Sequence, residues 1–213
     1  MEPAQPVVSF SPDLTRSRLT VFFRPILAIP HILWLYLYGI GASVMFIGHW
    51  FVAIFTGTTP QSTYDFLVGH QAYSTRVSAY MLYLTNDWPP FDNDDPYAAT
   101  LHMPAPREVV QGRASSFFRT LLAIPALFVA YGYGIALYVV VILAWFAIMV
   151  TGRMPAGFQR FGERAMTYSA RLSSYTYLLQ RVYPKMVDAQ TQRTMVGAPA
   201  VPAIDATSTG PFS

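Results

Sequence analysis

The chain has 213 residues, of which 53% are hydrophobic and 12% are charged, and its formal net charge is +3. A soluble domain carries about a quarter charged residues to cover its surface, so this composition argues against a soluble globular protein. The absence of cysteine excludes disulfides, thiol catalysis and cysteine-ligated metal centres. The basic residues cluster beside apolar runs, which suits anionic phospholipid and not nucleic acid.

Residues 1–13 are polar and contain proline, and they lack the basic and apolar segments of a signal peptide. After this extension we predict a first membrane repeat (14–90), an acidic proline-rich linker (91–106) and a second membrane repeat (107–185). The tail, 186–213, has no apolar periodicity and is predicted to be disordered or bound to a partner.

The two repeats are visible when the sequence is shifted by 95 positions, because it then matches itself without a gap. Identical residues in register include arginine, glycine, tryptophan and proline, which composition alone does not align. The matched pairs include Arg18 with Arg113, Arg24 with Arg119, Pro30 with Pro125, Trp50 with Trp145, Gly57 with Gly152, and Arg76 with Arg171. This internal repeat predicts two copies of one helical unit.

Each copy begins with a short segment of spaced basic and apolar residues (13–25 and 107–120), predicted as a helix lying in the membrane interface. A long run without charged residues follows (26–55 and 121–150), and about twenty apolar residues are enough to span a bilayer. We predict one transmembrane helix in each run, beginning near a proline and closed by Gly57 or Gly152 as a C-cap.

The third element of each copy (62–85 and 157–180) has apolar residues at helical spacing with charged residues between them. It either lies on the membrane surface as an amphipathic helix or crosses the bilayer. Basic clusters precede both long runs, and they share one side of the membrane only if each copy crosses an even number of times. We therefore favour two crossings per copy in the bacterial cytoplasmic (inner) membrane, with both termini in the cytoplasm. The predicted class is an all-α, multi-pass integral membrane protein.

The repeated pattern also resembles a known family. The residues that carry it in the first copy are Arg24, Ala28-Ile29-Pro30-His31, Trp50-Phe51, Thr56-Gly57, Pro60, Arg76, Tyr80 and Trp88-Pro89-Pro90. In this pattern the chain resembles domain of unknown function 4389, a family of bacterial membrane proteins, in two tandem copies. The second copy departs from it where Ala126 replaces His31 and Lys185 follows Pro184. The resemblance implies a membrane location and tandem copies, and it implies no activity.

Two sets of residues are candidates for a binding site. Arg76 and Arg171 lie within the third elements, near Tyr80 and Tyr175. Because each copy has such an arginine, we predict a lipid-headgroup or anion site that the two copies share. The alternative is that each arginine makes an ion pair or a carbonyl contact that stabilises its own unit. Arg24 and Arg119 are predicted as phospholipid anchors.

The sequence contains no catalytic motif, and we expect neither an enzyme nor a bound cofactor or metal. His49 lies inside a long apolar run and is a candidate haem ligand, but the second copy has Ala144 at the matching position and supplies no symmetric partner. The preferred interpretation is a non-catalytic accessory subunit that binds phospholipids and a larger membrane protein complex. The alternative is a lipid- or quinone-binding protein that uses the cleft between the two repeats. A small oligomeric channel is disfavoured because no apolar run has a polar face.

Overall fold

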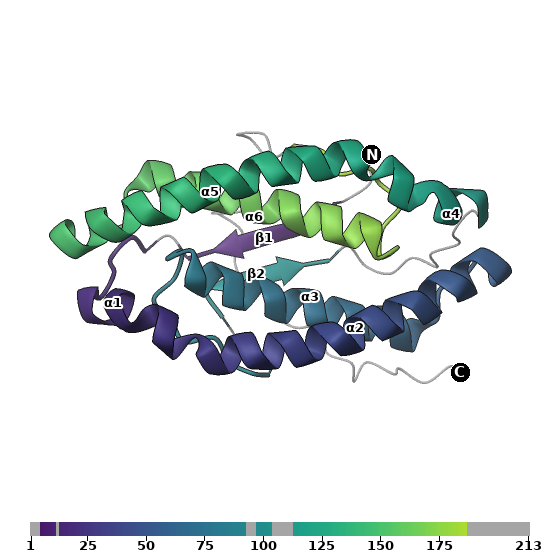
Figure 1. Cartoon of the computed structure of the whole chain (residues 1–213), viewed down its shortest axis with the longest axis horizontal. Coiled ribbons are helices and arrows are strands. Elements are labelled where there is room, and N and C mark those ends of the chain that lie inside the picture. The colour runs from purple at the N-terminus through teal and green to yellow at the C-terminus, as the bar shows by residue number, and fades with distance from the viewer. Residues whose placement is uncertain (1–4, 12, 93–96, 104–112, 187–213) are drawn as a thin grey trace, which may run out of the picture.

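The structure is a computed structural model that describes residues 5–11, 13–92, 97–103 and 113–186. The elements are β1 (Val7–Phe10), α1 (Arg18–Leu27), α2 (Ile29–Thr56), α3 (Gln61–Met81), β2 (Ala99–His102), α4 (Arg113–Leu122), α5 (Ile124–Thr151) and α6 (Ala156–Thr176). The long helices α2 and α5 lie in front in Figure 1, α3 and α6 lie behind and between them, and the strands run behind these. The predicted tail begins at the edge of the described residues and lies almost wholly outside them.

The two long helices form where the sequence predicts them. Pro30 and Pro125 lie in the first turn, where the missing N–H of proline removes no helical hydrogen bond. Gly57 (φ 76°) and Gly152 (φ 71°) end the helices in the left-handed conformation, so both predicted C-caps are confirmed. Within the described residues, two helical stretches are long and apolar enough to cross a membrane, 29–56 and 116–151.

The two copies run in opposite directions along the molecule (Figure 1). The short helix of each copy lies beside the far end of the other copy's long helix. Arg16 N donates to Gly152 O (2.9 Å) at the end of α5, and Trp50 Nε1 donates to Ser116 O (3.3 Å) near the end of α2. The copies are therefore related by an approximate twofold axis that crosses the long axis of the molecule.

The predicted all-α class needs one correction, because a small antiparallel sheet joins the N-terminal extension to the linker. Val7 pairs with His102 and Phe10 pairs with Ala99. β1 packs on α6 and β2 packs on α3, so the sheet covers the back of both inner helices. The pairing was missed because each strand has only four residues and its partner is about ninety positions away.

The third element of each copy is a helix, as predicted, and it lies inside the molecule. Half of the residues along α3 and α6 are buried, and neither helix has an exposed large hydrophobic residue. Each long helix packs along one inner helix, with Tyr38 against Phe66 in the first copy and Tyr133 against Phe161 in the second. The two inner helices, α3 and α6, therefore form the centre of the fold, and the candidate site lies between them.

Candidate functional site

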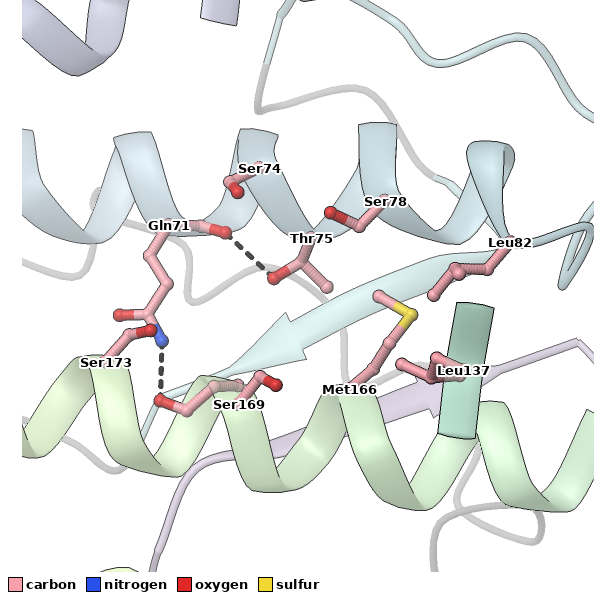
Figure 2. Close-up of a pocket in the computed structure, with 10 residues that line it drawn as sticks. Gln71, Ser74, Thr75, Ser78, Leu82, Leu137, Met166, Ser169 and Ser173 are labelled. Carbon is pink, nitrogen blue, oxygen red and sulfur yellow. Dashed lines mark hydrogen bonds between the residues drawn. The ribbon is translucent and has the colours of Figure 1, made fainter. Parts of the chain in front are cut away.

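A pocket of about 190 Å³ lies between the two repeats, where α3 and α6 face each other (Figure 2). The side chains around it come from both inner helices, and Leu137 of α5 borders one side. The lining residues are Gln71, Ser74, Thr75, Ser78, Leu82, Leu137, Met166, Ser169, Ala170 and Ser173. In Figure 2 the two strands run behind the inner helices, and no strand residue is among those that line the pocket.

Four of the lining hydroxyls occupy matching positions of the repeat. Ser74 corresponds to Ser169, and Ser78 corresponds to Ser173. In each helix the two serines are four residues apart, which places them on one face. Within the described part of the chain none of these four hydroxyls makes a hydrogen bond. They therefore remain available to a group that enters the pocket.

Gln71 joins the two copies, and together with Thr75 it makes the pocket asymmetric. Gln71 Nε2 donates to Ala170 O (2.7 Å) and to Ser174 Oγ (2.9 Å) across the interface between the copies. The position that matches Gln71 is Met166, and the position that matches Thr75 is Ala170. The pocket is consequently more polar along α3 than along α6.

The lining of the pocket combines hydroxyl groups with apolar side chains. Among the described residues that line the pocket there is no aspartate, glutamate, histidine, lysine or arginine that could act as a base toward the serines. Among the described residues, no group of three or more histidine, aspartate or glutamate side chains is placed to hold a metal ion. Hydroxyls combined with apolar side chains suit the hydroxyl or carbonyl groups of a neutral ligand.

The predicted arginine pair does not line this pocket. Arg76 Nη1 donates to Asp92 O in the linker, while Arg171 donates to Pro6 O (3.2 Å) and to Lys185 O (2.9 Å). Each arginine lies two positions from a pocket serine, which is about 200° around the helix. The arginines thus hold the N-terminal extension, the start of the linker and the segment after α6 against the inner helices. The cleft between the copies is lined by serines instead.

Arg24 is buried where the first copy's short helix meets the end of α3. It is 1% exposed, and its Nη1 donates to Tyr80 O (2.7 Å) and Thr85 O (3.0 Å). Its guanidinium lies 4.2 Å from the centre of the Tyr80 ring and 5.2 Å from that of Tyr83. Burial is the largest effect on the pKa of Arg24 and lowers it, while the neighbouring tyrosines raise it. The side chain therefore holds α1 against the turn after α3.

Arg119 repeats this arrangement in the second copy. It is 2% exposed, its Nη1 donates to Gln180 O (2.9 Å), and its guanidinium lies 5.0 Å from the Tyr175 ring. These carbonyl contacts agree with the stabilising role considered for the other repeated arginines. The phospholipid-anchor role of Arg24 and Arg119 stays a prediction.

The two histidines of α2 make hydrogen bonds with α3. His31 Nδ1 lies 2.8 Å from the Tyr73 hydroxyl, and its ring stacks on Phe91 at 4.3 Å. His49 Nδ1 lies 2.7 Å from the Thr63 hydroxyl. Sequence reasoning considered these histidines but overlooked the pocket serines, although the Ser-x-x-x-Ser spacing recurs in both copies.

Comparison with known families agrees with this repeated architecture. The model of the family described as Domain of unknown function (DUF4389) matches residues 18–92 and again residues 113–187. The chain belongs to the DUF4389 family. The predicted resemblance and its two tandem copies are therefore confirmed, and the matched segments contain α1–α3 and α4–α6. Neither the search of curated proteins nor that of solved structures found a match.

Proposed function

We propose that this DUF4389 protein is a non-catalytic accessory subunit that associates with a larger protein complex in the bacterial cytoplasmic membrane. The observation that carries the membrane part is the distribution of exposed apolar side chains. Among the described residues, every exposed large hydrophobic side chain lies on α1, α2, α4 or α5, apart from Trp88, Phe91, Tyr183 and Met186. A patch this extensive is typical of a surface that contacts lipid or another protein.

A groove on the outer face of α5 supports the protein-binding part of the proposal. It has a volume of about 330 Å³ and is lined by Tyr131, Gly134, Ile135, Tyr138 and Val139. A Cβ added at Gly134 would meet nothing within 4 Å, so no internal contact requires glycine there. Glycine within a helix costs about 1 kcal/mol relative to alanine, and close approach of a partner helix would account for that cost.

Affinity purification of the tagged full chain in mild detergent, followed by mass spectrometry, tests this proposal. We expect larger membrane subunits to co-purify in fixed ratio with the wild type. In the Gly134→Leu variant the leucine should fill the groove, and the partner subunits should no longer co-purify. In the Gly48→Leu variant they should co-purify as with the wild type. Gly48 is a matched control because a Cβ there also meets nothing within 4 Å. Recovery of the wild-type protein without any partner would overturn the accessory role.

The second candidate function is binding of a neutral lipid or quinone in the pocket between the repeats. The observation that favours it is the set of four unbonded serine hydroxyls described above. Lipid analysis of gently extracted protein should detect one enriched neutral ligand. Ser78→Leu should reduce that ligand, while Ser43→Leu, on the exposed side of α2, should leave it unchanged. A ligand content equal to that of bulk membrane in the wild type would refute this function.

A further inference from the structure

The first step concerns the common direction of the helices and strands. α2 packs along the length of α3, with His31 on Tyr73 near one end and His49 on Thr63 near the other. Figure 1 shows α5, α6 and both strands running along the same long axis. These elements therefore share one orientation in the membrane. The long axis of the molecule lies either along the membrane normal or in the membrane plane.

The second step concerns the basic residues. The exposed Arg18 lies at the end of the molecule where α5 finishes, donating to Val150 O (2.9 Å), while the exposed Arg113 begins α4 beside the end of α2. If the long axis followed the membrane normal, the equivalent basic segments would face opposite sides of the membrane. The positive-inside rule disfavours that arrangement. If the long axis lies in the membrane plane, the approximate twofold axis is parallel to the membrane normal. Both copies then contact the same leaflet through equivalent residues.

The third step concerns the sheet. Among the described residues, β1 and β2 pair with each other alone, so each strand has an open edge. The sheet lies near the middle of the long axis and carries the half-buried polar residues Ser9, Thr100 and His102. In a spanning orientation it would lie near the bilayer centre, where each unsatisfied backbone group costs several kcal/mol. With the long axis in the plane, the sheet faces water.

We infer that the protein lies on one leaflet with its long axis in the membrane plane. α1, α2, α4 and α5 are immersed in that leaflet, and the sheet faces the aqueous side. α2 has no charged residue in 28 positions, and its exposed side chains include Val44 and Ile47, so hydrocarbon fits this face. Exposed arginines at both ends of the molecule complement anionic headgroups. A protein that lies on one leaflet does not cross the membrane, and zero crossings per copy also place the basic clusters of both copies on the same side of the membrane. This inference rests on the proposed membrane association.

The cysteine-free sequence allows a direct test with single-cysteine variants of the full chain. We would label spheroplasts and inside-out vesicles with a membrane-impermeant maleimide. Gln61→Cys and Arg153→Cys report on the two ends of the molecule, Thr100→Cys on the sheet, and Val44→Cys on the apolar face. The in-plane orientation predicts that both ends and the sheet are labelled from the same side, and that Val44→Cys is labelled only after detergent.

Labelling of the two ends from opposite sides, with Thr100→Cys protected, would overturn the in-plane orientation and establish a spanning one. Ser62→Cys and Asp13→Cys repeat the comparison at independent exposed positions. Flotation of the wild-type protein with membranes tests the proposed membrane association separately from the in-plane orientation. Failure to float would sink the membrane association and the orientation together, whereas flotation with opposite-side labelling would sink the orientation alone.

Discussion

Replacing Arg24 by alanine distinguishes a structural role of the repeated arginines from a phospholipid-anchor role. Arg24 donates to two backbone carbonyls at 2.7 and 3.0 Å and lies over the Tyr80 ring. A hydrogen bond to a charged group contributes about 1.5–3 kcal/mol, and a cation–π contact contributes about 0.5–2 kcal/mol. Because removing the side chain also relieves the burial of a cation, we expect a net loss of about 3 kcal/mol. For a chain of this size that lowers Tm by about 6–12 °C.

Thermal unfolding in detergent, followed by tryptophan fluorescence, measures this loss. Arg18→Ala is the matched control, since Arg18 lies on the same helix, is exposed, and donates to one carbonyl. Its replacement should change stability by less than about 1 kcal/mol. The structural role would be refuted if Arg24→Ala left Tm unchanged while lowering the fraction of protein that floats with anionic vesicles.

Two further predictions concern the helix ends and the interface between the copies. Gly57→Ala or Gly152→Ala should each cost about 1–2 kcal/mol, because φ is 76° or 71° at these positions, and thermal unfolding against Gly48→Ala as control would check this. Gln71→Met should cost about 2 kcal/mol through loss of two buried hydrogen bonds between the copies, while the exposed Gln61→Met should cost less than half as much. An equal Tm for Gln71→Met and the wild type would contradict this role of Gln71.

The elements that sequence reasoning predicted are those determined by local chemistry. Charge-free runs, a proline in the first turn and a closing glycine specify α2 and α5 without reference to the rest of the chain. The internal repeat then predicts that each copy folds in the same way. A register of identical arginine, tryptophan and glycine residues is sufficient for that inference.

The features that sequence reasoning missed depend on contacts between distant segments. The pairing of β1 with β2 requires the N-terminal extension to reach the linker, and four residues per strand leave little periodicity to detect. The opposite direction of the two copies is likewise a property of their packing. Arg76 and Arg171 contact backbone carbonyls outside their own helices, Asp92 O and Lys185 O, which agrees with the carbonyl-contact alternative. The lipid-headgroup or anion site stays a prediction.

The two copies share some residues that line the pocket and differ at others. The serines recur in both copies, so symmetry alone accounts for a hydroxyl-lined cavity at the twofold axis. Gln71 and Thr75 do not recur, because Met166 and Ala170 replace them, and this difference makes the α3 wall more polar than the α6 wall. A ligand with one polar end and one apolar end fits such a pocket better than a symmetric ligand does. If the in-plane orientation holds, α5, which contributes Leu137 to the pocket, is immersed in the leaflet, where amphiphiles of that kind are found.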